Sequence, residues 1–455
     1  MKKALAILLA VTMACVLFAA CGSGSSSSSS SSSSSTGTAD TSQSSSTTPS
    51  SSGTAAPADV TLAFTWWGNQ TRTERTEAAC KLYTEQNPNV TFELSAISGK
   101  EYWDKMTALA AGSNAPDLMQ QDYDRFKIFQ EKGILEDMKA YVDSGVIDLS
   151  DIPEVFLGAG QVDGGYYAFN LGVNAPCLVY NKTLLDEAGI TVPDQLTWDD
   201  FNALAKEVFE KTGVKTSYGT YYGPQHQIRM SVRNSGKHVY NEAGDGLGFD
   251  DVSLVERVFA NYEYSRTSGY GVAGELYTGA TSVELGPIVT RDSWCEFLNT
   301  NQVVALQAAM EDELAMAMNP EFADKTTDGA YLKPSVMISL GAQGTQEEKD
   351  AAAAVVNYLL NSVEANEILL AERGVPINTK VREAIADKVD ETTQKTFDVI
   401  SLVEQHSTAI DNPDPAFALE LDQAAKVLMD EVLYGNKTAQ QAAEEWMAKA
   451  QSLIG

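Results

Sequence analysis

Aromatic, amide and carboxylate side chains follow segments of the N-terminal half that have the pattern of β-strands. Aromatic rings cover the apolar faces of cyclic ligands, while planar amides and carboxylates pair with hydroxyl groups. Their shared chemistry is therefore stacking and hydrogen bonding. Because side chains alternate along a strand, two adjacent tryptophans must point to opposite faces. The set is Trp66, Trp67, Asn69, Gln121, Asp122 and Tyr123.

Catalysis is the alternative chemistry, and the sequence offers few motifs for it. His226, His238 and His406 are scattered, without an HExxH or similar metal-binding spacing. No GxSxG motif surrounds a serine of the body, and no Walker-type phosphate loop is present. Asp122 and Asp124 would suit glycoside hydrolysis only at a defined separation of their carboxyl groups. We therefore expect a binding protein rather than an enzyme, without a cofactor or a metal.

Alternating strands and helices position the candidate residues. Val60–Trp67, Val90–Leu94 and 116–119 have strand patterns, and Arg72–Gln86 and Trp103–Ala111 have helical periodicity between them. This order predicts a parallel sheet covered by helices, in which ligands bind beyond the carboxyl ends of the strands. The candidate side chains all follow such ends, so we expect them at one rim. Further along, the sequence predicts a helix beginning after Thr197, which is its N-cap.

The first residues have the pattern of a secretion signal. Lys2 and Lys3 precede an apolar run over 4–20, which ends in small residues before Cys21. This ending resembles the lipobox of bacterial lipoproteins, which implies signal removal over 1–20 and lipid attachment at Cys21. The serine-rich remainder of 21–59 has almost nothing apolar to bury, so it predicts a disordered tether with a reach of roughly 35 Å. We expect the protein on the extracellular face of the cell membrane.

Composition limits the remaining classes. The formal net charge of the 455-residue chain is −30, which disfavours nucleic acid as a partner because phosphate binding requires clustered Lys and Arg. From Val60 onward no second long apolar run occurs, and the body is large enough for two lobes. Cys80, Cys177 and Cys295 have no CxxC spacing and predict small buried hydrophobic residues, not a disulfide framework.

A series of short segments resembles the extracellular solute-binding proteins of ABC importers, in the family of maltose-binding protein. The series spans nearly the whole body. It consists of Tyr102-Trp103-Asp104-Lys105, Asn114 to Leu118, Glu131 to Leu135, Leu178 to Leu185, Ala188-Gly189-Ile190, Thr197 to Phe201, Arg373 to Asn378 and Gly435 to Thr438.

The resemblance implies an α/β, two-lobed periplasmic-binding-protein-like fold of type II. Each lobe would be a helix-covered, mainly parallel sheet, and the chain would cross the hinge near 170–174, 336–342 and 375–381. The first lobe would comprise 60–172 with 337–376, and the second 173–336 with 377–455. The implied partners are a small-molecule solute, most simply a sugar or oligosaccharide, and the permease subunits of an ABC transporter. We expect a monomer.

The resemblance also implies which residues bind the solute in the cleft. Trp67 is the favoured aromatic, with Trp66 as the alternative. One of Asp122 and Asp124 would accept ligand hydroxyls while the other caps the next helix, and Asn174 would contribute an amide at the first hinge crossing. The remaining expected contacts are Asn69, Gln70, Gln121, Tyr123, Tyr222, Gln225, His226 and Glu311.

One departure from the family concerns the second lobe. The expected stacking tryptophan is absent where Gln302 leads to Glu311, so Trp294, Tyr221 or Tyr222 would have to replace it. The ligand therefore need not be a maltodextrin. Two other functions share some of these features: a solute receptor that feeds a sensor system, and a carbohydrate-active enzyme.

Overall fold

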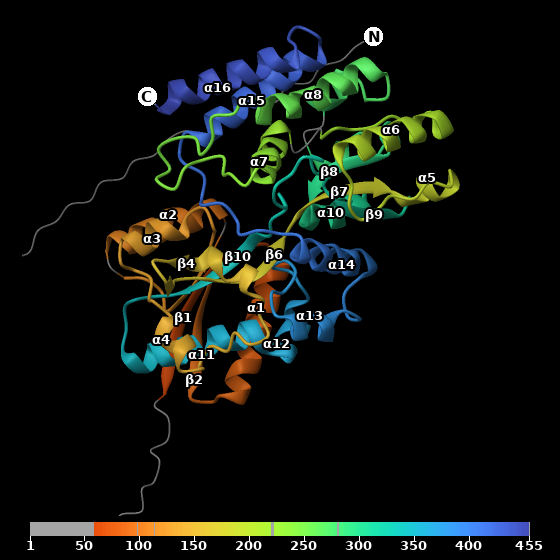
Figure 1. The fold of residues 1–455 in the computed structure, drawn as a ribbon. Helices are drawn as coiled ribbons and strands as arrows, with labels where there is room; N and C mark the ends of the chain where they lie inside the picture. The colour runs from red at the N-terminus through yellow and green to blue at the C-terminus, as the bar shows by residue number, and fades with distance from the viewer. Residues whose placement is uncertain (1–58, 98, 113, 220–222, 280–281, 455) are drawn as a thin grey trace, which may run out of the picture. The chain divides into compact units, whose positions relative to one another are not determined.

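Two separate β-sheets organise the chain between Pro57 and Gly455 (Figure 1). The structure is a computed structural model, and it describes residues 59–97, 99–112, 114–219, 223–279 and 282–454. The signal, Cys21 and almost all of the tether lie outside the described residues. We call each sheet with its covering helices a lobe. The two-lobed α/β fold predicted from the sequence is confirmed.

The first sheet has the strand order β2-β1-β3-β10-β6. β1 pairs in parallel with β2 and β3, as predicted, whereas β10 is antiparallel to both of its neighbours. β10 is reversed because it comes back from the second lobe. The strands are β1 (Val60–Trp67), β2 (Val90–Ile97), β3 (Leu118–Gln121), β6 (Phe169–Asn174) and β10 (Lys333–Leu340), and a small ribbon pairs β4 (Gln161–Val162) with β5 (Gly165–Tyr166).

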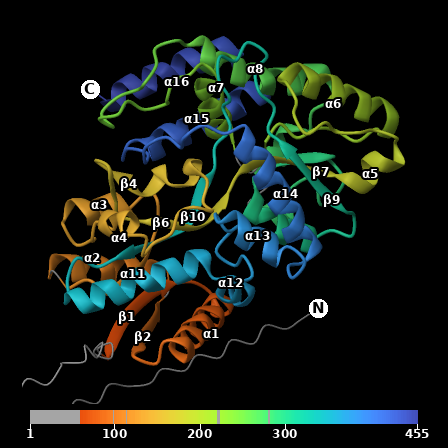
Figure 2. The ribbon, with the colours of Figure 1, turned by 60° about the horizontal axis from the view of Figure 1, so that its bottom comes forward.

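Helices cover both faces of the first sheet, and its strands β3, β6 and β10 are buried along most of their length on both sides. Leu62, Phe64 and Trp66 are fully buried on one face of β1, in the core that includes α1 and α11. The opposite face packs against Tyr102 of α2 and Phe126 of α3. Figure 2 shows α11 and α12 along the first sheet. The helices of this lobe are α1 (Gln70–Gln86), α2 (Gly99–Ala111), α3 (Phe126–Glu131), α4 (Lys139–Asp143), α11 (Gln346–Asn361), α12 (Val363–Leu369) and α13 (Thr379–Ile385).

The second sheet differs from the prediction of a mainly parallel sheet. Its order is β8-β7-β9, and β7 pairs antiparallel with both neighbours. The described part of the chain between β7 and β8 contains the helices α5 to α9, so the chain can re-enter the sheet from its other end. The sheet consists of β7 (Pro176–Asn181), β8 (Cys295–Asn299) and β9 (Leu314–Met318).

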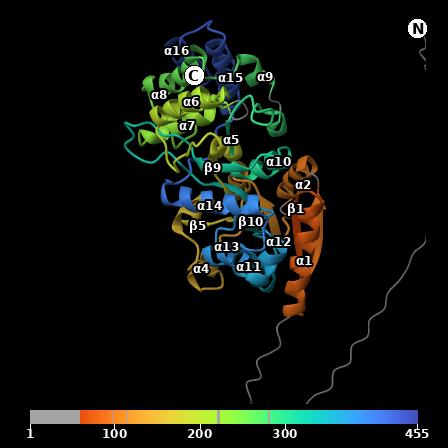
Figure 3. The same ribbon diagram turned by 90° about the vertical axis from the view of Figure 1, so that its right-hand side faces the viewer.

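Helices form a thick cover on the second sheet. α8, α15 and α16 pack on one another at the end of this lobe that lies away from α1 and α11 (Figure 3). Thr197 begins α6 with a capping box in which Asp200 takes part, which confirms the predicted N-cap. The helices are α5 (Lys182–Glu187), α6 (Trp198–Thr212), α7 (Pro224–Asn234), α8 (Ser253–Ser268), α9 (Gly274–Gly279), α10 (Val303–Ala308), α14 (Glu391–Gln405), α15 (Ala418–Leu433) and α16 (Ala439–Ile454).

The chain passes between the lobes at three places. It leaves the first sheet at Ala175, between β6 and β7, and returns between β9 and β10. α13 still packs on α12 of the first lobe, whereas α14 packs on β9 of the second, so the third passage follows Ile385. The first passage directly follows the stretch expected near 170–174. The second, before β10, precedes the expected 336–342, and the third, after Ile385, follows the expected 375–381.

Candidate functional site

The two tryptophans at the end of β1 have opposite environments. Trp66 is fully buried in the core of the first lobe, 5.2 Å from the ring of Phe64. Trp67 is half-buried on the other face, with its ring 4.9 Å from Tyr102 and 5.0 Å from Trp103. The alternation of β1 turns the ring of Trp66 into the core, so Trp67 is the tryptophan on the accessible face, and the contact of either with a solute stays a prediction.

Trp103 was not among the expected contacts, although it lies beside Trp67. It is half-buried near the start of α2, and the guanidinium of Arg125 stands 4.8 Å from its ring centroid. Arg125 also forms an ion pair of 3.3 Å with Asp122. Trp67 and Trp103 thus make a partly exposed aromatic surface, the aromatic rim, at the carboxyl end of β1. The position of Trp103 near the start of a helix between two predicted strands could have indicated that it lies at this rim.

The polar residues at the end of β3 and just after it differ in burial and in hydrogen bonding. Gln121, the last residue of β3, is fully buried, and its contact with a solute stays a prediction. Asp122 accepts a hydrogen bond from the backbone N–H of Asp124 at 2.9 Å, which makes it the residue that shapes the turn before α3. Asp124 is exposed. Desolvation raises the pKa of Asp124, and the nearby Lys333 opposes that shift. Of the two carboxylates, Asp124 is the one open to a ligand.

A charged hollow joins the first lobe to α7 of the second. It measures about 390 Å³ with its open mouth, and it is formed by Tyr123, Asp124, His226, Arg229, Tyr331, Lys333 and 410–414. Arg229 donates to Asp411 at 2.9 Å and to Asp414 at 2.6 Å. The Tyr123 hydroxyl donates to the backbone oxygen of Asp411 and is largely buried. The hollow thus brings the predicted Tyr123, Asp124 and His226 together.

Burial makes His226 a neutral hydrogen-bonding group. Desolvation lowers its pKa well below the usual value, and the cationic Arg229, Lys333 and Lys426 lower it further. A neutral imidazole carries one donor and one acceptor nitrogen, which suits an alcohol group. Sequence reasoning named His226 but missed Arg229 and Lys333, which reach the hollow from α7 and β10. Nothing in the local sequence of those two residues indicates this contact.

A polar groove contains two other predicted residues. Asn69 and Asn174 line it together with Thr300, in a space of about 1290 Å³ that includes its open mouth. The side chain of Asn69 caps α1 by accepting the N–H of Arg72 at 2.9 Å. Asn174 accepts a hydrogen bond from the hydroxyl of Thr300 at 3.5 Å. The neighbouring Gln70 is exposed and donates to Glu74 within α1.

Glu311 lies far from these residues. The end of the second sheet nearest the first lobe carries the pair Pro176 and Asn299, and the other end carries Asn181 and Leu314. Glu311 precedes Leu314, so it stands at the distant end of the second sheet, and its contact with a solute stays a prediction. The resemblance to the family placed Glu311 in the cleft. In the structure, α10 lies between the end of β8 and Glu311 and carries the chain away from that end.

The expected aromatic replacements in the second lobe have different outcomes. Trp294 is fully buried and donates to the hydroxyl of Thr216, so it belongs to the core. Tyr221 and Tyr222 lie outside the described residues. Gln225 is half-buried in the first turn of α7. Cys80, Cys177 and Cys295 are buried free thiols, as predicted.

Within the described residues, no three or more His, Cys, Asp or Glu side chains gather closely enough to hold a metal ion. Nor does any helix in that part of the chain have both the length and the apolar character required to cross a bilayer.

Comparison with protein families decides the class. The model of the bacterial extracellular solute-binding proteins matches residues 78–396, which is well over half of the chain. The chain belongs to this family. The resemblance deduced from the sequence is therefore confirmed.

The chain is also similar to individual solute-binding proteins, both in structure and in sequence. The structure of an extracellular solute-binding protein of family 1 from Alicyclobacillus acidocaldarius superposes with a TM-score of 0.80 at 28% identity, over 88% of this chain and 99% of the other. An arabinooligosaccharide-binding protein from Halalkalibacterium halodurans is 35% identical over 33% of both chains. A lactose-binding protein from Rhizobium radiobacter is 28% identical over 42% of this chain and 45% of its own. The chain thus matches between a third and a half of the length of these two curated relatives.

Proposed function

We propose that this solute-binding protein captures a sugar or oligosaccharide between its lobes and delivers it to the permease of an ABC transporter. The observation that carries the proposal is the aromatic rim of Trp67 and Trp103, together with the exposed carboxylate of Asp124, whose sequence neighbour Arg125 lies over the ring of Trp103. Tryptophan rings stack on the apolar faces of sugar rings, and a carboxylate accepts their hydroxyl protons. The names of the arabinooligosaccharide- and lactose-binding relatives support the same ligand class.

The two lobes would share the work of binding. The first lobe offers the aromatic rim and Asp124, and the second offers the neutral His226 of α7 across the charged hollow. A solute that touches both lobes stabilises the arrangement in which they are close, and it does so only by the difference in its affinity for the two arrangements. Capture requires no bond to break, so the solute is released unchanged.

The protein would work at the outer surface of the cell membrane. Cys21 follows a signal-like segment and resembles the lipidated cysteine of bacterial lipoproteins. A lipid there would hold the protein close to the permease, and the serine-rich tether would let the body turn toward it.

A thermal-shift screen of the Val60–Gly455 body against sugars tests the proposal. A solute that binds only the native state stabilises it by about 2.7 kcal/mol at a hundredfold excess over Kd. We expect at least one sugar or oligosaccharide to raise Tm and to be recovered chemically unchanged. A screen in which only solutes of other classes raise Tm would contradict the sugar assignment, and conversion of the sugar would contradict the binding role.

A further inference from the structure

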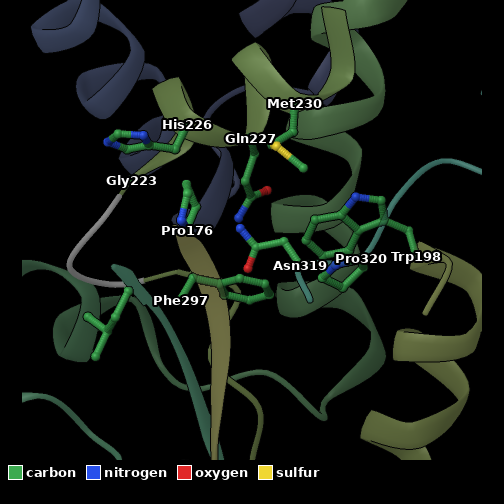
Figure 4. A pocket seen from close by; sticks show the side chains of 10 residues that line it. Pro176, Trp198, Gly223, His226, Gln227, Met230, Phe297, Asn319 and Pro320 are labelled. Atoms are coloured by element: carbon green, nitrogen blue, oxygen red, sulfur yellow. The ribbon is translucent and has the colours of Figure 1, made fainter. Parts of the chain in front are cut away.

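A second, mostly apolar pocket lies in the second lobe behind His226 (Figure 4). It lies between α7 and the end of the second sheet nearest the first lobe. Its volume is about 370 Å³ when the open solvent at its mouth is counted, but the space inside that a water-sized group can occupy is only about 20 Å³. His226 borders both this pocket and the charged hollow, so the pocket adjoins the proposed binding region. We call it the inner pocket. Its walls are Pro176, Trp198, Gly223, His226, Gln227, Met230, Phe297, Leu298, Asn319 and Pro320.

The walls of the inner pocket favour a small neutral group. Trp198 and Phe297 are buried, and their ring centroids are 5.7 Å apart. Rings at that spacing pack directly against each other, so they form one apolar wall of the pocket, and only a small group can lie against that wall. Among the described residues that line the pocket there is no Asp, Glu, Lys or Arg, and desolvation lowers the pKa of His226 well below its usual value, which keeps it neutral. A charged substituent would therefore lose its hydration without gaining a counter-ion.

The inner pocket contains a hydrogen-bond acceptor without a donor, and this acceptor indicates that the bound group carries an O–H or N–H. Gln227 is 7% exposed, and its Nε2 donates to the backbone oxygen of Tyr218, which fixes the orientation of the amide. Its Oε1 is buried and accepts no hydrogen bond from the described residues. The Oδ1 of Asn319 is in the same situation, and Figure 4 shows the two amides close together. A buried acceptor without a donor is costly, so the pocket is complementary to a ligand that brings an O–H or N–H group.

From this chemistry we infer that the inner pocket takes the hydroxymethyl group of a hexose unit and thereby selects hexoses over pentoses and uronates. The methylene contacts Trp198 and Phe297, and the hydroxyl donates to Oε1 of Gln227. A pentose lacks the group and leaves the acceptor unpaired, whereas a uronate places carboxylate oxygens against amide oxygens. The inference rests on the proposed function, because it names the sugar class of the same site.

The test compares sugars that differ only at this carbon. Glucose, xylose and glucuronate form one series, and galactose, L-arabinose and galacturonate form another, each measured by calorimetry as monosaccharides and, where available, as matched disaccharides such as cellobiose and xylobiose. We expect the hexose to bind at least about tenfold more tightly than the pentose and the uronate of its series. Equal or tighter binding of the pentose or the uronate would overturn the inference and leave the proposed function intact. If no sugar bound at all, the proposed function would fail as well.

Variants locate the selectivity. Gln227→Met keeps the length of the side chain but removes the acceptor, so the hexose preference should fall to within about threefold while pentose affinity stays near that of the wild type. Thr345→Ala, which removes the N-cap of α11 in the first lobe, is the control for lost stability and should keep the full preference. A Gln227→Met protein that retains the preference would overturn the inference. If that variant does not fold, the wild-type ratios decide alone.

Discussion

At the scale of single residues, strand alternation separates two chemically identical side chains. Trp66 packs into the core of the first lobe, and its neighbour Trp67 reaches the aromatic rim with Trp103. The difference is not in the residue type but in the face of β1 on which each ring lies. Binding and stability should therefore respond to different tryptophans.

We expect Trp67→Ala to weaken sugar binding by about thirtyfold or more, equivalent to about 2 kcal/mol, because a stacked aromatic is a typical binding hot spot. Trp66→Ala should instead lower the free energy of unfolding by about 3–5 kcal/mol, since it empties a fully buried site. Calorimetric Kd and denaturant unfolding measured on both variants distinguish these roles. Normal affinity in folded Trp67→Ala would assign the stacking surface to Trp103 alone.

Asp422 of α15 is a half-buried carboxylate whose pKa is raised. Burial raises its pKa to about 6, Asp414 contributes to the rise, and Arg229 and Lys426 oppose it. The pKa in the unfolded chain is about 3.9, so the folded state holds the proton more tightly than the unfolded state. The ionised form of Asp422 is therefore destabilising. This cost is fully present above about pH 6 and disappears as the pH falls through the window down to about 4.

Asp422→Asn should consequently raise the free energy of unfolding at pH 8 by about 2 kcal/mol, and the gain should shrink at pH 5. Urea unfolding at the two pH values measures it. Glu420→Gln changes an exposed carboxylate on the same helix and should give less than about 0.5 kcal/mol at either pH. A gain from Asp422→Asn that does not depend on pH would contradict the assigned titration.

Part of the candidate site was predictable residue by residue, because some roles are local. The opposite faces of Trp66 and Trp67 follow from alternation. The expectation that one carboxylate after β3 caps the next helix is wrong, because the N-cap position of α3 is Arg125 without a side-chain cap, and Asp122 instead closes the turn before it. The burial of Gln121 was not predictable, because it depends on β10, which pairs with β3 from more than 200 positions away. The same holds for Lys333 and Arg229, which meet Asp124 and His226 only in the folded chain.

At the scale of elements, α7 and the segment after α14 are held together by charge. The carboxylate of Asp411 accepts hydrogen bonds from Arg229 and Arg233 and contacts the His238 ring nitrogen at 2.7 Å. Burial raises the pKa of Asp411, but the two arginines and His238 outweigh it and the pKa is lowered overall. Because the Tyr123 hydroxyl binds the backbone of Asp411, this cluster also ties α7 to the first lobe.

We expect Asp411→Asn to lower the free energy of unfolding by about 3 kcal/mol or more, because it leaves the buried guanidinium of Arg233 without its counter-charge. Asp414→Asn is the matched control. It removes an exposed partner of Arg229 from the same segment and should cost less than about 1 kcal/mol. Denaturant unfolding of both variants at pH 7 tests the comparison, and equal losses would show that burial of the charge is not the cause.

The elements themselves were predictable where their signals are local. The three first strands and the intervening helices follow from periodicity, and Thr197 marks the start of α6 by its cap. The directions of β7, β8 and β9 could not be predicted in this way. These strands are short and lie far apart in the sequence, so their pairing depends on the packing of the helices between them.

At the scale of the whole molecule, the order of weak segments was more informative than any one of them. The family match and the two lobes were deduced from that order and are confirmed. The first passage between the lobes directly follows the stretch expected near 170–174, whereas the second precedes and the third follows the expected positions. The passages between the lobes have no distinctive amino-acid composition, because β6 and β10 have the sequence pattern of ordinary strands although each has one end near the other lobe. Membrane attachment remains a prediction, since Cys21 lies outside the described residues.

That attachment is testable on the full chain. Each buried methylene contributes about 0.8 kcal/mol, so one acyl chain holds a protein only marginally, and the several chains of a lipoprotein anchor hold it firmly. Cys21→Ala removes every one of them, and we expect the protein to move from the membrane fraction to the medium or periplasm. Its sugar affinity should be unchanged, because the proposed contacts all lie after Val60. Cys80→Ala, which alters a buried thiol of α1, is the control and should stay with the membrane. If Cys21→Ala fractionates with the membrane as the wild type does, the signal segment itself or a protein partner holds the chain, and the lipoprotein assignment is wrong.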